Sequence, residues 1–408
     1  MASPFFRRVI RRPAIKPEHG QLYDTLKPLW LELRFLGVLP VVKVTTEVGK
    51  PVFRRTFGAM LYSVVFYMVV GVFVVHTGVV KLQELRELKS SEFDEAVHGY
   101  MFLVYLVPHI ALPLCHWRQA EAIANFMTAW TTFQVRFEQV TRVSLQMKAS
   151  RKVTITMAVL VPLLTTVCIV VDWSVMPEFK VSEIYCYIYI CTLVYLHIAL
   201  WFTMCCSVAT TTRHLINVLR KGVQSGRHVS DYHSLWQELS QLSRKMGDCF
   251  CYIYGTVIVI WFAALTLCLY GGLIAIFNHG IHLRGITLLC NTVLCTSVLF
   301  VISDAGHRVC QEMGTNFYGA LHSLRLGANK EIKQELDFFR YDVAMNPPVI
   351  SLGGYVAVNR NLLLSLLATA VSHIVILLQF RIGVEPLTQS NTETHSSLFN
   401  QSCKLMCE

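Results

Sequence analysis

Charged residues are scarce in this chain. Asp, Glu, Lys and Arg make up 15% of its 408 residues, against about 25% in ordinary soluble domains. Hydrophobic residues make up 54%, and a soluble protein of this composition would expose large apolar patches and aggregate. The same apolar content excludes an intrinsically disordered chain. The composition therefore predicts a protein whose solvent is the lipid bilayer.

Signatures of enzymes and cofactor sites are also missing. The sequence has no Ser/His/Asp nucleophile pattern, no phosphate-binding glycine loop and no HExxH zinc motif. Its 14 Cys form neither a disulfide framework nor paired CxxC zinc sites, and Cys249 and Cys251 are a lone C-x-C. His109 and His116 lie two helical turns apart, about 10.5 Å along the axis, which is too far for one metal ion. We expect no enzymatic activity, no metal and no cofactor.

Long apolar runs dominate what is present. A hydrocarbon core about 30 Å thick needs roughly 20 apolar residues per helix. Seven stretches meet this requirement, and none contains an internal Lys, Arg, Asp or Glu. They are residues 56–80, 96–117, 153–171, 184–209, 250–277, 286–302 and 361–380. The sequence therefore predicts an all-α membrane protein with seven transmembrane helices.

Basic residues are unevenly distributed between these spans. The N-terminal segment and the second, fourth and sixth connections carry most of the Lys and Arg. Because basic residues stay in the cytoplasm, we expect a cytoplasmic N-terminus and an extracellular C-terminus. The net charge of +10 then reflects membrane topology, and no nucleic-acid partner is expected. In the outer tail, Asn400 is a glycosylation candidate, and Cys403 and Cys407 are either a disulfide or two free thiols.

Helices are expected to continue beyond the membrane on the cytoplasmic side. Apolar residues at three- and four-residue spacing predict one helix from about Asp231 to Phe277. The sixth span continues inward in the same way, and a separate amphipathic helix follows, with Ile332, Leu336, Phe339 and Val343 on one stripe. Such stripes need partners, so we expect a packed cytosolic bundle. Helices lying on the membrane surface are the alternative.

A break separates these helices from the last span. Pro347 and Pro348 end the helical pattern, and Gly353 and Gly354 interrupt it again before a new helix begins near Asn359. A hinge directly before a membrane helix is a natural place for a gating motion. An ordinary loop is the alternative interpretation of the same residues.

Three motifs carry a resemblance to a known family. The last span ends in Ser372-His373, five hydrophobic residues and Gln379-Phe380, which resembles the Thr-Tyr, five hydrophobic residues, Gln-Phe motif of arthropod gustatory receptors. The stretch 354–360, GYVAVNR, and the N-terminal stretch 22–40 resemble the corresponding family segments in the expected order. His373 in place of the family's Tyr is the departure, and it puts in doubt any role carried over from that tyrosine.

The resemblance implies both a fold and an activity. It implies a homotetramer with a central pore lined by the last helix of each subunit, related to insect odorant receptors. It also implies ligand-gated, non-selective cation conduction in the plasma membrane of chemosensory cells, opened by a small-molecule tastant. Membrane lipid and other gustatory receptor subunits are further expected partners. The cytosolic helices would form the tetrameric anchor. A metabotropic seven-helix receptor coupled to a G protein is the alternative, although an Asp/Glu-Arg-Tyr motif does not close the third span.

Two sets of candidate site residues follow. A hydrophobic constriction can close a pore by dewetting, and a polar ring can bind passing ions, so the pore and gate are assigned to the motif residues and their helical neighbours: Ser372, His373, Ile376, Gln379 and Phe380. Phe380 as a simple interfacial anchor is the alternative. Aromatic and polar residues at the outer ends of the spans suit a small organic or sugar-like ligand; they are His98, Tyr100, Tyr105, Asp172, Trp173, Tyr185, Tyr189, Asn278 and Asn291.

The expected organisation along the chain follows these assignments. Residues 1–55 form a cytoplasmic segment, and residues 56–302 hold the first six spans with their cytosolic extensions. Residues 303–360 form the anchor helices and the hinge, residues 361–380 the pore-lining span, and residues 381–408 an extracellular tail.

Overall fold

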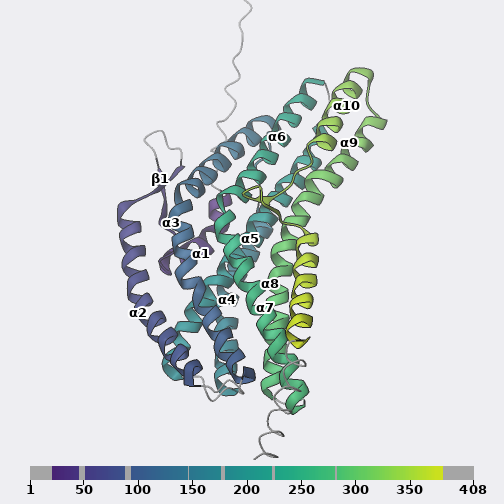
Figure 1. The fold of residues 1–408 in the computed structure, drawn as a ribbon. Coiled ribbons are helices and arrows are strands. Elements are labelled where there is room, and N and C mark those ends of the chain that lie inside the picture. The colour runs from purple at the N-terminus through teal and green to yellow at the C-terminus, as the bar shows by residue number, and fades with distance from the viewer. Residues whose placement is uncertain are drawn as a thin grey trace, which may run out of the picture.

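The protein is a bundle of long helices with two small β-hairpins (Figure 1). The computed structural model describes residues 21–45, 51–87, 93–145, 147–175, 180–222, 226–280 and 283–379. In chain order the elements are α1 (Gln21–Phe35), β1 (Val41–Thr45), β2 (Pro51–Arg55), α2 (Phe57–Glu87), α3 (Phe93–Thr141), α4 (Lys148–Val175), α5 (Val181–Gly222), α6 (Gly226–Cys249), α7 (Cys251–His279), α8 (Leu283–Gln311), the π-helical turn η2 (Glu312–Asn316), α9 (Phe317–Leu326), α10 (Lys330–Met345), β3 (Ser351–Leu352) and β4 (Val356–Ala357). A final helix, here called the last helix, follows as Arg360–Gln379.

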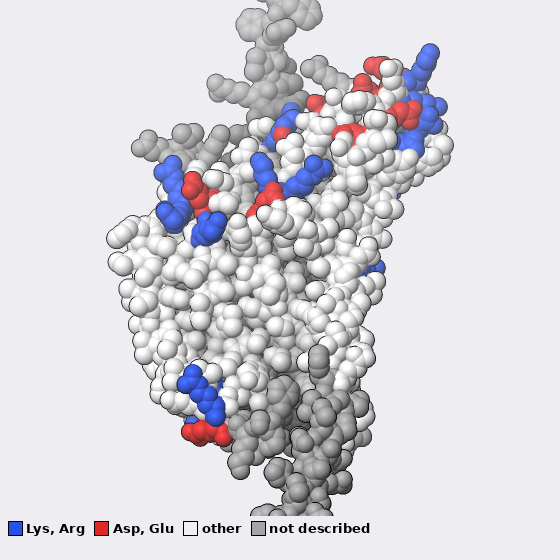
Figure 2. Space-filling model, in the orientation of Figure 1, with Lys and Arg blue, Asp and Glu red and all other residues white. Residues whose placement is uncertain are grey.

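Seven helices of the described part of the chain are long and apolar enough to cross a membrane, which confirms the predicted number of spans. Figure 2 shows a broad belt without Lys, Arg, Asp or Glu around the middle of the visible face, with charged side chains gathered at both ends. One end carries α6, α9 and α10 beyond the belt and is called the α10 end below. The other is called the opposite end.

Helix α5 forms the centre of the bundle, and most of its apolar window is buried. It contacts α4 and α8 most extensively and also touches α1, α2, α3 and α6. Two hydrogen bonds join α5 to its neighbours: Trp201 Nε1 of α5 donates to the carbonyl of Ile302 on α8 at 3.1 Å, and Tyr254 of α7 donates to the carbonyl of His197 on α5 at 2.8 Å. Because lipid offers no replacement hydrogen bonds, these contacts lock α5 against α7 and α8.

The helix predicted to run from Asp231 to Phe277 is divided in the structure. It begins at Gly226, and Phe250 interrupts it with a φ of −113° between α6 and α7. Close packing lies beside this break, because a Cβ on Gly247 would stand 2.2 Å from the carbonyl oxygen of Ser351 in β3. The hairpin that follows α10 therefore packs directly on the α6 backbone. The break was not predicted, because it lies beside this long-range contact and no proline marks it in the local sequence.

The helices at the α10 end form a packed bundle, as the sequence predicts. The sixth span continues from α8 through η2 into α9, and α10 folds back beside α6 and α9. The predicted stripe of α10 faces the core: Leu336, Phe339 and Val343 are buried, and Ile332 is partly buried against the same core. Phe339 meets Phe317 of α9 and Trp236 of α6 with ring centroids 5.3 and 5.9 Å apart. Aromatic packing of this kind holds three separate helices together.

The N-terminal elements cover one side of the bundle near the α10 end. Leu26, Leu29 and Leu33 of α1 are fully buried against the other helices. The indole of Trp30 donates to the carbonyl of Val41 at 3.3 Å and ties α1 to the β1–β2 hairpin. This hairpin pairs Val41 with Arg55 and Thr45 with Pro51, and its second strand lies on α3.

Candidate functional site

The last helix is attached to its own subunit by few side chains. Among its residues only Ala370 and Ile374 are buried, and an apolar series remains exposed, with Ile376 at 47%. The predicted pore residues Ser372, His373, Ile376 and Gln379 all lie on the exposed surface, and Phe380 lies outside the described residues. The ring of His373 contacts Phe262 of α7 at a centroid distance of 6.0 Å.

Polar side chains follow the exposed surface of the last helix along its whole length. Asn361, Ser365, Thr369, Ser372 and Gln379 are all exposed. The hydroxyls of Thr369 and Ser372 donate to the carbonyls four residues earlier, which partly satisfies them. Within the described residues, the amides of Asn361 and Gln379 make no such hydrogen bond, and polar groups in a membrane helix normally face protein or water. This surface is therefore unsuited to lipid.

An ion-pair cluster holds the base of the last helix. The carboxylate of Asp304 on α8, with its side chain 6% exposed, accepts from Arg360 Nε at 2.9 Å and Nη2 at 2.7 Å. Its second oxygen meets Arg308 Nε at 2.6 Å. Just before Arg360, the β3–β4 hairpin returns the chain to α8, and Val358 N donates to the carbonyl of Ile350 at 2.9 Å.

The predicted hinge residues lie in this returning segment. Gly353 and Gly354 form the hairpin turn with φ values of 59° and 79°, a conformation that favours glycine. The chain between α10 and β3 contains Pro347 and Pro348. A Cβ placed on Gly314 in η2 would lie 3.7 Å from Pro348 Cδ. The segment is thus an ordered connection packed on α6 and α8.

A cavity of about 550 Å³ lies between the spans, among α3, α4, α5, α7 and α8. Its lining consists of Tyr105, Met157, Val161, Leu164, Thr165, Cys168, Ile169, Asp172, Cys191, Tyr195, Ile198, Ala199, Phe202, Trp261, Asn291, Leu294 and Val301. Concave sites of this size, mostly apolar with a few polar groups, are typical of small-molecule binding.

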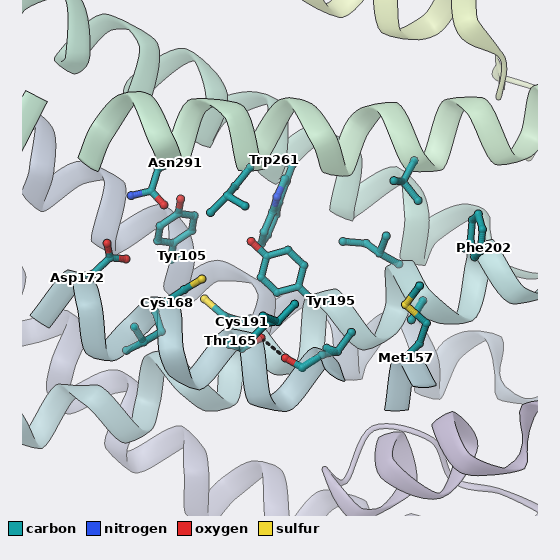
Figure 3. A pocket seen from close by; sticks show the side chains of 17 residues that line it. Tyr105, Met157, Thr165, Cys168, Asp172, Cys191, Tyr195, Phe202, Trp261 and Asn291 are labelled. Carbon is teal, nitrogen blue, oxygen red and sulfur yellow. Dashed lines mark hydrogen bonds between the residues drawn. The ribbon is translucent and has the colours of Figure 1, made fainter. Parts of the chain in front are cut away.

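The two ends of the cavity differ in polarity (Figure 3). Asp172, Asn291 and the hydroxyl of Tyr105 gather at one end, whereas Met157 and Phe202 lie at the other. Tyr195 and Trp261 stand between them, with ring centroids 6.1 Å apart in an edge-to-face arrangement. Asp172 lies one turn from the end of α4, so the polar end of the cavity faces the opposite end of the molecule from α10.

Comparisons with known proteins agree with this arrangement. The model of the 7tm chemosensory receptor family matches residues 26–383. The chain belongs to this family. Gustatory and odorant receptor 24 of Anopheles gambiae is 29% identical to this chain, and the match covers 89% of this chain and 79% of that receptor. Gustatory and odorant receptor 21a of Drosophila melanogaster is 24% identical, and the match covers 90% of this chain and 82% of that receptor. The family is one of receptors, so the protein is an insect-type chemosensory receptor of the plasma membrane and not an enzyme.

A solved structure shares the receptor's fold. The insect olfactory receptor OR5 from Machilis hrabei, in complex with eugenol, superposes with a TM-score of 0.62 at 12% identity. The match covers 88% of this receptor and 98% of that chain. The resemblance to insect gustatory receptors, related to odorant receptors, and the all-α fold with seven spans are thereby confirmed.

The structure brings three of the predicted pocket residues together. Tyr105, Asp172 and Asn291 of this receptor all line the cavity. Tyr100, Trp173 and Tyr185 are exposed on the surface of the bundle, at 45%, 40% and 77%. Tyr189 instead packs edge-to-face on His109, and Asn278 is exposed near the end of α7. The side chain of His98 lies outside the described residues, as do Asn400, Cys403 and Cys407.

Sequence reasoning missed the aromatic centre of the cavity. Tyr195 and Trp261 lie in mid-span on α5 and α7, whereas the pocket residues predicted from the sequence lie at the outer ends of the spans. One feature of the sequence could have indicated them: each is an aromatic residue with a polar atom in the middle of an apolar run. A buried hydroxyl or indole N–H usually requires a hydrogen-bond partner, so such a position is a candidate for a binding site.

His109 and His116 of α3 pack against neighbouring rings. His109 stacks on Tyr67 of α2 with centroids 4.9 Å apart. His116 faces His197 of α5, with the two Nε2 atoms 2.6 Å apart, so one ring donates a hydrogen bond to the other. Among the described residues, no group of three or more His, Cys, Asp or Glu side chains is placed to hold a metal.

Proposed function

We propose that this receptor is a ligand-gated, non-selective cation channel that assembles as a homotetramer, alone or with other gustatory receptor subunits, with the last helices around a central pore. A small organic tastant in the cavity opens it. The N-terminus and the α10 end lie in the cytoplasm, and the opposite end lies outside, because the basic connections collect at the α10 end.

One observation carries this proposal: the polar stripe of the last helix is exposed in the single subunit. Asn361, Ser365, Ser372 and Gln379 recur at three- and four-residue multiples along one helical face. Lipid is a poor environment for that face. Around a fourfold axis the stripe would instead line a water-filled path, while Ala370 and Ile374 hold the helix to its own subunit.

The gate is assigned to the outer end of this path. Ile376 and Gln379 are exposed at successive positions of the stripe, and Phe380 follows in the sequence. Four copies of an apolar side chain can close a pore by excluding water, and four amides above it can coordinate a passing cation. His373 lies on the neighbouring face, beside Phe262.

Helix α8 connects the proposed ligand site with the base of the pore helix. Val301 lines the cavity, and Asp304, three residues further along α8, binds Arg360. This step spans only about 4.5 Å of helix. A ligand that shifts α8 would therefore move the Asp304–Arg360 contact and the hinge segment packed beside it, which is how we infer that binding reaches the gate.

The cavity suits a small organic tastant. Its volume of about 550 Å³ lies within the roughly 300–1,000 Å³ usual for such ligands. The olfactory receptor with the same fold was solved with eugenol, a molecule of this class. Entry from the outside agrees with the position of the polar end, close to the end of α4.

Ligand-evoked current in excised membrane patches tests this function. The full chain is expressed in cells without other chemoreceptors, and small organic compounds are applied to outside-out patches perfused without nucleotides. The proposal predicts currents that begin with the ligand and carry Na⁺ and K⁺ about equally. Responses seen only in whole cells, and lost when GTP is withheld, would instead indicate the metabotropic alternative.

A further inference from the structure

The polar end of the cavity holds a carboxylate, Asp172, that has no partner among the described residues. Within the described residues, Asp172 makes no hydrogen bond and no ion pair. The two described lysines at this end of the molecule are already engaged: Lys180 pairs with Glu84 at 2.8 Å, and Lys81 pairs with Glu183 at 3.0 Å. A carboxylate left unpaired beside apolar walls is costly, so a ligand that pairs with it would gain binding free energy.

The groups around Asp172 restrict what that ligand can be. Asn291 is nearly buried and also makes no hydrogen bond within the described residues. The Tyr105 hydroxyl is near the Cys295 sulfur at 3.9 Å, and the Tyr105 ring packs 6.0 Å from that of Trp261. The polar end thus offers one acid, one amide and aromatic faces, which together suit a positively charged group.

The rest of the cavity accepts only an apolar body. Beyond the aromatic pair of Tyr195 and Trp261, the lining is Met157, Phe202 and aliphatic side chains. A ligand that fits both ends has a cationic head and a compact hydrocarbon body. A carboxylic acid would meet the like charge of Asp172, and a hydrocarbon would leave the carboxylate unpaired.

We propose that the cavity takes a small lipophilic amine, with its ammonium group paired to Asp172 and Asn291 and its apolar body between Trp261 and Phe202. This inference rests on the proposed function, because it names the ligand class of the same cavity. Tyr105 and Tyr195 flank the head, and their ring faces add attraction for a cation. The amine reaches the site as a neutral or charged species and binds as the cation.

Matched pairs of probes separate charge from shape. Tritiated 2-phenylethylamine is bound to the purified full chain in nanodiscs, and binding is competed with 2-phenylethylamine, 2-phenylethanol, hexylamine and hexanol. Each amine has nearly the size of its alcohol. Because a charge-assisted hydrogen bond in a desolvated site exceeds a neutral one, each amine is expected to bind about tenfold more tightly than its alcohol.

Two variants locate the effect. Asp172→Asn keeps the shape of the side chain, so amine affinity is expected to fall about tenfold while alcohol affinity changes less than about threefold. Tyr185→Phe, on the exposed surface outside the cavity, is the control and leaves every affinity unchanged. Elution of each variant at the wild-type position on size exclusion shows that it is folded.

The outcomes decide between the two proposals. Amine and alcohol of equal affinity, an amine preference that survives Asp172→Asn, or no specific binding of the tritiated amine would each overturn the amine assignment. Binding that depends on Asp172 but evokes no current would uphold it and overturn the channel. Currents evoked by the alcohols, with no amine preference in binding, would uphold the channel and overturn the amine assignment.

Discussion

A single methyl group at Gly306 is expected to disturb the base of the pore helix. An alanine Cβ at this position of α8 would stand 2.5 Å from the carbonyl oxygen of Val358 and 2.9 Å from Val358 Cγ1. Val358 belongs to the segment that leads into the last helix. Since carbon contacts are comfortable at about 3.5 Å, this segment has to retreat by about 1 Å.

The size of the effect follows from two opposing contributions. Overpacking of a tight contact costs about 1–3 kcal/mol, whereas replacing glycine by alanine inside a helix gains up to about 1 kcal/mol. Gly319 of α9 provides the matched control, because a Cβ there meets nothing within 4 Å. Subtracting Gly319→Ala from Gly306→Ala removes the propensity gain and leaves the clash, about 1–3 kcal/mol of destabilisation.

Thermal unfolding of the purified variants measures this difference. At roughly 2 °C per kcal/mol for a chain of this size, Gly306→Ala should melt about 2–6 °C below Gly319→Ala at the same scan rate. Ligand dose–response curves recorded in parallel should shift for Gly306→Ala and stay unchanged for Gly319→Ala. Equal melting temperatures within a degree, with unshifted curves, would refute the close packing of the hinge on α8.

Three further predictions concern charged and aromatic contacts. Arg360→Gln leaves Asp304 paired with Arg308 alone and should lower the free energy of unfolding by about 1 kcal/mol, which the melting temperature measures. Arg360→Lys should restore only part of this stability, since a lysine cannot form both of the arginine's hydrogen bonds to Asp304. Partial burial raises the pKa of Asp342, but hydrogen bonds from Gln237 and His233 outweigh it, so the pKa is lowered. Its stabilisation is therefore complete above about pH 4 and lost as the pH falls further, and Asp342→Asn should flatten that part of a melting-temperature profile. Trp201→Phe removes the indole hydrogen bond to the Ile302 carbonyl, which keeps its backbone bond within α8, and should cost about 1 kcal/mol in the same assay.

The spans were predictable because the bilayer imposes a strong one-dimensional rule. Twenty apolar residues without a charge can hardly be anything else, and the stripe of Leu336, Phe339 and Val343 repeats at a helical period. The break at Phe250 is not marked by any local pattern. It lies beside the contact between Gly247 and β3, which is about a hundred residues further along the chain. Contacts of that sequence separation are set by tertiary packing and leave little local trace.

The cavity was predictable only in part for the same reason. Tyr105, Asp172 and Asn291 follow from asking which polar residues stand near the outer ends of the spans. Whether a residue such as Tyr185 points inward or outward depends on the rotation of its helix, and it is in fact exposed. Trp261 lies in mid-span, far from the membrane interfaces, so only the packed structure shows that it lines the cavity.

Substituted-cysteine accessibility of the last helix tests the proposed pore most directly. Ser372→Cys and Ile376→Cys place a thiol on the exposed stripe, whereas Ala370→Cys places it against the receptor's own core, where Ala370 is 1% exposed. A charged methanethiosulfonate applied to ligand-opened channels is predicted to block current through the first two variants and to leave Ala370→Cys and the unmodified receptor unaffected. Current that persists in Ser372→Cys and Ile376→Cys after complete modification would contradict a pore lined by this helix.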